Sequence, residues 1–286
     1  MNRKMADLHR AYQEGAMTRR EFVDRLAELA GGTAAALALL PVLEGRRAQA
    51  QITQENDERL AIERVEYEAP DGKMIGYLAR LKGGGKRPAV IVIHENRGLN
   101  AHIRDVARRM ALEGFLALAP DALSPLGGTP PEEDKAVKML GSLNAAETAA
   151  RLAAAVPYLA RHAESTGKVG VVGFCWGGGM VNRVAAAGTT LNAAVSYYGA
   201  QLPAAEVPRI TAPLLLHYAS EDQRINAGIP DFEAALKANG KIYEIYMYEG
   251  AQHAFNNDTN AARYNKEAAE LAWGRTVRFL KKYLSP

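Results

Sequence analysis

One cysteine, one aspartate and one histidine stand where the nucleophile, acid and base of a hydrolytic enzyme would follow one another along a chain. Cys175, the only cysteine among 286 residues, lies in the segment GFCWGGG. Asp222, with Glu221 beside it as a competing carboxylate, comes after the apolar run PLLLHYA, and His253 comes after YEIYMYEG. An imidazole can take the proton of a thiol while a carboxylate fixes the tautomer of that imidazole. The order of the three residues predicts covalent catalysis by a Cys-His-Asp triad.

The glycines around Cys175 indicate a nucleophile elbow, which is a sharp turn from a strand into a helix. Side chains at Gly173 and Gly177 would collide with the neighbouring strand and helix. We expect the Trp176 amide to donate to an oxyanion and the positive end of the following helix to favour a thiolate. The alternatives are a cysteine that is only a small buried apolar residue and a phosphate-binding loop. The second is disfavoured because the Lys-Ser/Thr of such a loop is absent and Trp176 would obstruct it.

For these residues to meet, loops that follow several strands must lie at one edge of a sheet. Short apolar runs alternate with helical patterns, and the runs near residues 90, 170 and 215 are apolar throughout, as in a parallel sheet covered on both faces. The sequence therefore predicts one α/β domain with a mostly parallel sheet of about eight strands, and a poorly structured or loosely helical region at 124–134 over one face. The expected strands are 62–69, 74–81, 89–95, 115–120, 169–174, 192–199, 213–219 and 243–249, the first two forming an antiparallel edge hairpin, and the expected helices are 102–114, 145–162, 178–188, 229–240 and 265–284.

The overall composition is that of an ordinary globular protein. Hydrophobic residues make up 48% and charged residues 23% of the chain, and the net charge is +3. This charge is small and no basic stripe is visible, so we expect no nucleic-acid partner. A single cysteine excludes an internal disulfide. The sequence leaves the oligomeric state open.

Residues 1–50 have the features of a twin-arginine export signal. Arg19 and Arg20 precede Phe22, a weakly apolar stretch follows from 29 to 43, and Ala48-Gln49-Ala50 fits a signal-peptidase site. The stretch is too short to anchor the chain in a bilayer. We therefore expect export machinery as a partner, a periplasmic location, and a nearly neutral mature domain over 51–286. The alternative is a cytoplasmic protein whose N-terminal amphipathic helix packs on the domain, as Asp24 and Glu28 suggest.

The remaining histidines give little support to a metal site. His9 lies in the export segment, His102 and His162 lie at helix ends, and His217 lies in a buried strand where a hydrogen-bonded core histidine is expected. His94 precedes Glu95 at the active edge of the sheet, where it could touch substrate or brace the loop. These two residues together with Asp222 and His253 could bind a metal, but no H-E-x-x-H or comparable spacing is present. We expect neither a metal nor an organic cofactor.

The segments HENRGLN, GFCWGGG, SEDQRIN and GAQHAFNN together resemble the dienelactone hydrolase family of α/β-hydrolases, over roughly residues 60–284. The resemblance implies an α/β-hydrolase fold and a triad of Cys175, Asp222 and His253. It also implies that Glu95 contacts the resting thiol and that the amides of Asn96 and Trp176 form the oxyanion hole. A buried carboxylate needs a partner, and the thiol proton would be one. The alternative for Glu95 is an ion pair with Arg97 or Arg104.

The chain departs from the family pattern after the histidine. There the resemblance leads one to expect a serine and, soon after, an arginine that helps hold a substrate carboxylate, whereas Ala254, Phe255, Asn256 and Asn257 follow His253. Arg97 or Arg224 could supply the missing cation. The candidate substrate contacts are therefore His94, Arg97, Arg224 and Phe255.

The sequence as a whole predicts a hydrolase of small esters or lactones that resembles carboxymethylenebutenolidase. A second hypothesis is a non-catalytic ligand-binding protein or a redox sensor in which Cys175 reports oxidation. A sensor does not need the Asp222 and His253 pair, so the pair favours catalysis. Acyl transfer to an acceptor other than water is a third hypothesis.

Overall fold

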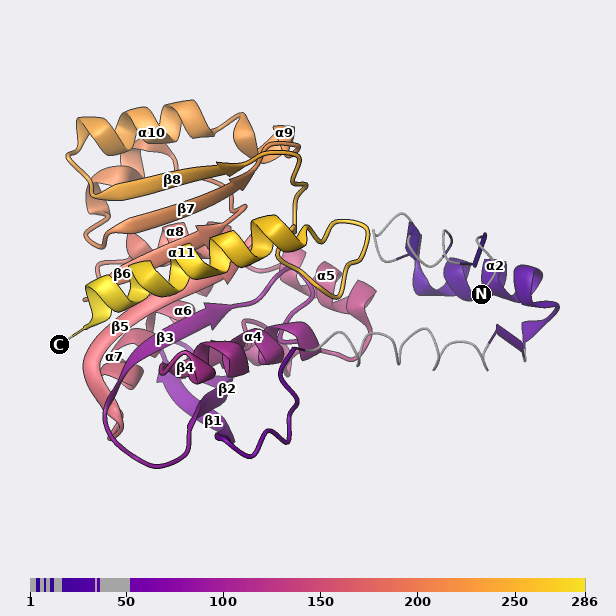
Figure 1. Cartoon of the computed structure of the whole chain (residues 1–286), viewed down its shortest axis with the longest axis horizontal. Helices are drawn as coiled ribbons and strands as arrows, with labels where there is room; N and C mark the ends of the chain where they lie inside the picture. Colours follow the sequence, from indigo (N-terminus) through magenta and orange to yellow (C-terminus); the bar gives the residue numbers. More distant parts are fainter. Residues whose placement is uncertain are drawn as a thin grey trace.

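The computed structural model describes residues 4–5, 8, 11–12, 17–33, 35–36 and 52–285. Residues 52–285 contain an eight-stranded sheet with helices on both faces (Figure 1). The number of strands and the α/β class agree with the sequence prediction. The strands are β1 (Leu60–Ala69), β2 (Gly72–Leu81), β3 (Arg87–Ile93), β4 (Leu116–Pro120), β5 (Ser165–Phe174), β6 (Ala193–Tyr197), β7 (Leu214–Ala219) and β8 (Tyr243–Tyr248).

The strand order is β1-β2-β4-β3-β5-β6-β7-β8. Strands β1 and β2 pair antiparallel at one edge, which confirms the predicted hairpin, and β2 also pairs antiparallel with β4. All the other pairs are parallel. The loops that follow β3, β5, β7 and β8 consequently open at the same edge of the sheet.

The helices form two layers, each packed on one face of the sheet. Alternate residues of the central strands point to opposite faces, so Ile91 and Val171 belong to one apolar core while Val90 and Val172 belong to the other. The first core includes residues of α6 (Ala145–Ala153), α7 (Ala155–Ala160), α8 (Trp176–Ala185) and α10 (Ile229–Ala238); the second includes residues of α4 (Ala101–Leu112) and α11 (Lys266–Leu284).

Two helical regions differ from the prediction. The single helix expected over 145–162 is divided into α6 and α7. The region 124–134 contains the short 3-10 helix η1 (Ser124–Leu126), and its end begins α5 (Glu133–Gly141), which the periodicity did not reveal. Two further short elements, η2 (Ala204–Arg209) and α9 (Gln223–Asn226), were also not predicted.

Part of the N-terminal segment forms helix α2 (Arg19–Ala30). An amphipathic helix in this segment was the alternative to an export signal in the sequence analysis. Thr18 caps the helix, and Glu21 completes a reciprocal capping box. Phe22 and Leu26 are buried in a small apolar cluster of this segment. The expected cleavage site at 48–50 and most of the apolar stretch lie outside the described residues. Within the described part of the chain, every helix is too short or too polar to cross a bilayer.

Candidate active site

Cys175 occupies a strained turn between β5 and α8, as the elbow prediction requires. Its backbone angles, φ of 55° and ψ of −116°, lie in a region that residues other than glycine rarely adopt. A Cβ on Gly173 would lie 2.8 Å from Val181 and closer to the backbone oxygen of Gly177. A Cβ on Gly177 would lie 2.5 Å from the carbonyl oxygen of Ile93. The turn as it stands therefore leaves no room for a Cβ at either position.

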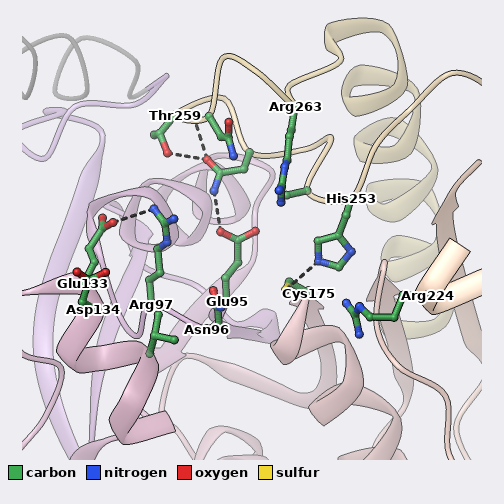
Figure 2. A pocket seen from close by; sticks show the side chains of 14 residues that line it. Glu95, Asn96, Arg97, Glu133, Asp134, Cys175, Arg224, His253, Thr259 and Arg263 are labelled. Carbon is green, nitrogen blue, oxygen red and sulfur yellow. Dashed lines mark hydrogen bonds and ion pairs between the residues drawn. The ribbon is translucent and has the colours of Figure 1, made fainter. Parts of the chain in front are cut away.

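The side chains of Cys175, His253 and Asp222 meet at the carboxyl edge of the sheet. His253 Nε2 lies 2.9 Å from Cys175 Sγ (Figure 2), and His253 Nδ1 is hydrogen-bonded to Asp222 Oδ2 on the other side of the ring. Asp222 is also the N-cap of α9, where its side chain accepts from the Ile225 amide. Glu221 does not take this place. The three residues that the sequence predicted as a triad thus form one chain of contacts through His253.

The electrostatics of the pair favour charge separation. Burial opposes protonation of His253, but the hydrogen bonds to Asp222 and Cys175 outweigh burial and raise the pKa of His253 to about 9. For Asp222, burial raises the pKa, but the hydrogen bond and charge of His253, the Ile225 amide and the charge of Arg224 together outweigh burial, so the net pKa is lowered. A pKa of about 9 keeps the His253 ring protonated at neutral pH, with the Asp222 carboxylate at Nδ1 and Cys175 Sγ at Nε2.

Two residues expected to touch substrate are buried instead. Phe255 is 0% exposed and packs among aromatic rings, including Tyr198 at 5.3 Å. His94 is also 0% exposed; its Nδ1 lies 2.7 Å from the Glu95 carbonyl oxygen, and its Nε2 accepts from the Ala122 amide. The prediction of substrate contact is wrong for both residues, because neither reaches the cavity. His94 braces the loop, which was the other expectation for it.

Glu95 lies at the site but is held differently from either expectation. Its side chain is 5% exposed, and Oε2 accepts a 2.6 Å hydrogen bond from Asn257 Nδ2. Its other oxygen, Oε1, is buried and has no hydrogen-bond partner among the described residues. Arg97 pairs with Glu133, and Arg104 lies 3.6 Å from Glu55, so the alternative ion pairs of Glu95 are not formed. Within the described residues, Cys175 Sγ is hydrogen-bonded to His253 and not to Glu95.

The sulfur opens into a cavity of about 440 Å³ that carries many charged groups (Figure 2). Arg97 and Arg224 line it, as predicted. A third arginine, Arg263, also lines the cavity and was missed by the sequence analysis. It lies ten positions after the histidine, beyond residues 254–257, where the family pattern had led us to look for a cation. The other lining residues are Glu95, Asn96, Glu133, Asp134, Val137, Cys175, His253, Ala254, Asn257, Thr259 and Asn260.

The two amides expected to form an oxyanion hole are available. Asn96 follows β3, and Trp176 is the first residue of α8, where an amide has no partner inside the helix. Neither amide donates a hydrogen bond to another group in the described part of the chain. The Trp176 ring stacks on His94 at 5.3 Å, which fixes the two loops against each other.

The remaining histidines have structural environments. His217 is buried between Thr276, 3.0 Å from its Nε2, and Tyr248, 2.9 Å from its Nδ1, as expected for a core histidine. His162 accepts from the Glu164 amide, while His9 lies outside the described residues. No group of three or more potential metal ligands is present among the residues that the structure describes.

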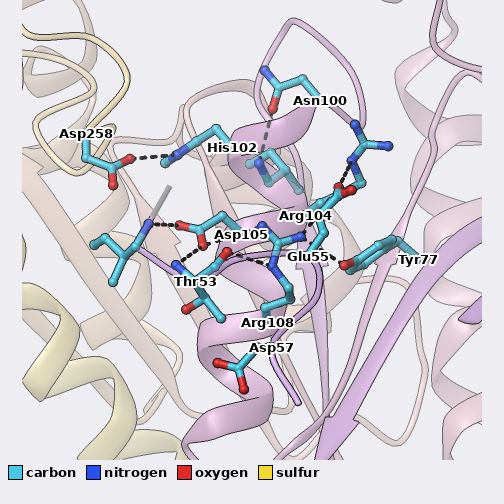
Figure 3. Close-up of polar contacts among 12 residues, drawn as sticks. Thr53, Glu55, Asp57, Tyr77, Asn100, His102, Arg104, Asp105, Arg108 and Asp258 are labelled. Atoms are coloured by element: carbon cyan, nitrogen blue, oxygen red, sulfur yellow. Dashed lines mark hydrogen bonds and ion pairs between the residues drawn. The ribbon is translucent and has the colours of Figure 1, made fainter. Parts of the chain in front are cut away.

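Helix α4 ties the start of the domain to the loop that follows His253 (Figure 3). The carboxylate of Asp105 accepts from the Thr53 amide at 2.7 Å, and Arg108 donates to the Thr53 carbonyl and to Tyr77 at 2.9 Å each. Both charged side chains are 0% exposed. One turn before Asp105, His102 lies 3.0 Å from Asp258 of the loop. The segment at 52–53 is thus part of the fold of the domain.

Comparisons with known proteins agree with this architecture. Residues 74–284 match the model of the dienelactone hydrolase family. A relative from Saccharolobus solfataricus, named "Putative carboxymethylenebutenolidase", is 33% identical in an alignment of 252 residues that covers 76% of this chain and 96% of the relative. A Bradyrhizobium relative, named "Probable 2-oxo-3-(5-oxofuran-2-ylidene)propanoate lactonase", is 32% identical and covers 79% of this chain and 96% of its own.

A solved structure gives the same result. The protein titled "Putative Dienelactone Hydrolase from Klebsiella pneumoniae subsp. pneumoniae MGH 78578" superposes with a TM-score of 0.71 at 30% identity, over 78% of this chain and 99% of the other. The elbow, the sheet order and the matched region all lead to one conclusion. The chain is an α/β-hydrolase enzyme that belongs to the dienelactone hydrolase family.

Proposed function

We propose that the protein hydrolyses the ester or lactone bond of a small molecule, with Cys175 as the nucleophile. The observation that carries the proposal is the chain of contacts from Sγ through the His253 ring to Asp222, at the wall of a cavity of about 440 Å³. A cavity of this size suits a small substrate. The names of the two relatives, a carboxymethylenebutenolidase and a lactonase, support the same bond type.

The mechanism follows from the placement of these groups. The Cys175 thiolate attacks the carbonyl carbon, and the amides of Asn96 and Trp176 hold the oxyanion. The bond to the leaving oxygen breaks as His253 gives that oxygen its proton. His253 then takes a proton from water, the hydroxide attacks the acyl carbon, and the thiolate leaves. The raised pKa of His253, about 9, provides the protonated imidazole that the first departure needs.

The cavity suits an ester or lactone that also carries an anionic group. Arg224 and Arg263 flank His253 (Figure 2), and no hydrogen bond or ion pair holds either guanidinium among the described residues. Arg97 differs because Glu133 neutralises it at 2.8 Å. A planar guanidinium pairs well with a carboxylate. We therefore propose that Arg263 and Arg224 together bind the carboxylate of the substrate, a role for which the sequence alone did not identify the arginine.

The test uses the full chain with Cys175→Ala, Cys175→Ser and His253→Ala, and a panel of aryl esters and enol lactones. We expect each variant to lose at least about a thousandfold in kcat/KM, because the residues act as one unit. Near wild-type turnover by Cys175→Ala and His253→Ala would reject the mechanism. For the anionic group, Arg263→Met and Arg224→Met should raise KM for a carboxylate-bearing ester about tenfold and leave a neutral ester of the same size unchanged.

Acylation of Cys175 by a substrate would distinguish a hydrolase from the competing hypothesis of a redox sensor. An activated aryl ester should give a burst of one phenolate per chain, and the mass of the trapped protein should increase by one acyl group at Cys175. Oxidation of the thiol without any acylation would favour the sensor. If an added alcohol or amine captured the acyl group in place of water, the protein would be an acyl transferase.

We also propose that residues 1–50 direct export through the twin-arginine route. The order of arginine pair, apolar stretch and small residues supports this. The contacts of Asp105 and Arg108 with residue 53 begin directly after the expected cleavage site. The chain recovered from the periplasm should begin at Gln51, and replacing Arg19 and Arg20 by lysine should retain it in the cytoplasm at full length. Recovery of an uncleaved, active wild-type chain in the cytoplasm would contradict the proposal.

A further inference from the structure

Asn257 makes the one hydrogen bond that holds the side chain of Glu95 within the described part of the chain. Its Nδ2 donates to Glu95 Oε2 at 2.6 Å. Both side chains are buried, Asn257 at 9% and Glu95 at 5% exposure, and both line the cavity with Cys175. Oε1 of Glu95 is buried without a hydrogen-bond partner among the same residues. Oε2 of Glu95 is therefore occupied by a hydrogen bond, whereas Oε1 has none among the described residues.

The orientation of the Asn257 amide is set from its other end. Oδ1 accepts from the Thr259 amide at 3.0 Å and from the Thr259 hydroxyl at 2.6 Å. A backbone N–H can only donate, so the atom that faces it must be the oxygen, and the NH₂ group must face Glu95. Since the NH₂ group cannot accept, Oε2 must be the unprotonated oxygen of the carboxyl group. Any proton that Glu95 takes up must reside on Oε1.

We propose that Asn257 is a positioning residue of the active site, which reserves Oε2 of Glu95 as an acceptor and leaves Oε1 as the one oxygen that exchanges a proton with the cavity. In Figure 2, Oε1 points away from the hydrogen bond to Asn257, toward the side where Arg263 and His253 lie. The role rests on the proposed function, because it matters for turnover only if the chemistry takes place at Cys175. Thr259 assists by fixing the amide.

An aspartate at this position provides a sharp test, because its effect must depend on pH. In Asn257→Asp two carboxyl groups would face each other at the distance of the present hydrogen bond. At low pH they would share one proton, and the protonated aspartate would donate to Oε2 as the amide does. As the pH rises that proton is lost, the two carboxylates repel, and Glu95 is displaced. In Asn257→Ala the donor is missing at every pH.

The experiment measures kcat and KM for a neutral aryl ester between about pH 5 and pH 9 in the full chain. We expect Asn257→Ala to lower kcat about tenfold or more at all pH values, with KM within about twofold. Asn257→Asp should approach the wild type at the acidic end and fall progressively behind it toward the alkaline end. Thr259→Ala should show a smaller loss, because the backbone donor to Oδ1 remains. The charge control is Asn239→Asp, an exposed helix end whose variant should follow the wild-type curve.

Two results would overturn the proposal: a folded Asn257→Ala with kcat within about twofold of the wild type, or a ratio of Asn257→Asp to wild type that does not change with pH. If Asn257→Ala does not fold, the ratio for Asn257→Asp decides. The rate of Cys175 alkylation by iodoacetamide gives a readout that needs no turnover. Its midpoint should move to higher pH in Asn257→Asp and not in Asn239→Asp. If Cys175→Ala is fully active while this shift is seen, the proposed function fails and the placement of Asn257 stands.

Discussion

The close contact between the elbow and β3 predicts that one substitution, glycine to alanine, has opposite effects at two positions of the same helix. Alanine in a helix is favoured over glycine by up to about 1 kcal/mol. At Gly179 the new Cβ would meet Ala200 at 3.5 Å, an ordinary contact, so Gly179→Ala should stabilise the protein by about 0.5–1 kcal/mol. At Gly177 the new Cβ would lie 2.5 Å from the Ile93 carbonyl oxygen and closer still to that of His94, both of them backbone atoms.

Relief of this clash requires the end of β3 and the elbow to separate by several tenths of an ångström. Overpacking of this kind costs about 1–3 kcal/mol, which exceeds the helix gain, so Gly177→Ala should be destabilising by about 1–2 kcal/mol. The movement would also part the amides of Asn96 and Trp176 and reduce kcat about tenfold or more. Gly179→Ala should retain its activity.

Urea unfolding of both variants, followed by tryptophan fluorescence, measures the difference between them. The difference in unfolding free energy should be about 1.5–3 kcal/mol at unchanged m-value. Equal unfolding free energies and equal kcat values for the two variants would refute the reasoning that backbone contact, rather than chain flexibility, requires glycine at residue 177.

Three further outcomes are expected. Arg108→Met should lower the unfolding free energy by about 3 kcal/mol or more, because it removes one of the cations beside the buried Asp105 carboxyl group. It also leaves the Thr53 carbonyl and the Tyr77 hydroxyl without their donor, and a loss below about 1 kcal/mol in thermal unfolding would contradict this. Because folding raises the pKa of His253 from 6.5 to about 9, protonation of this ring should stabilise the folded protein fully below about pH 6.5, and this stabilisation should be lost as the pH rises through 9. In urea unfolding, the wild type should therefore lose stability relative to His253→Gln over this range. Parallel pH curves for the two proteins would argue against it. Thr276→Val should cost about 2–4 kcal/mol, because two buried partners of its hydroxyl, Tyr197 and His217, lose their hydrogen bonds, whereas Thr276→Ser should cost much less in the same assay.

The features that local patterns determine were predictable. Continuous apolar runs are required where helices cover both faces of a strand, so the central strands were placed to within a few residues. The glycines that flank Cys175 are a local steric requirement, and the elbow followed from them. The boundary between α6 and α7 falls in a run of alanines, whose apolar periodicity continues across the break. Helix α5 was missed because only Ala136 and Leu140 of its nine residues are buried, which gives a weak periodic signal.

The side of the cavity opposite the elbow could not be predicted, because it is formed by a polar loop without repeating structure. Asn257 and Thr259 act through hydrogen bonds whose partners depend on how residues 254–264 are folded. Arg263 lies at the cavity for the same reason, because the fold of this loop places it there. For Phe255, adjacency to His253 suggested a substrate contact, but the positive φ of 69° at Ala254 turns the chain and sends the ring into the core.

The position of the only sulfur-bearing nucleophile in this chain has a consequence for its fate under oxidants. Cys175 is half-buried at the cavity, beside a protonated imidazole, and the chain has no second cysteine. If peroxide converts the thiol to a sulfenic acid, no resolving thiol of the same chain can trap it as a disulfide. Protection must then come from a small external thiol that enters by the substrate's own path, and without one the sulfur proceeds to sulfinic acid and the molecule is permanently silenced.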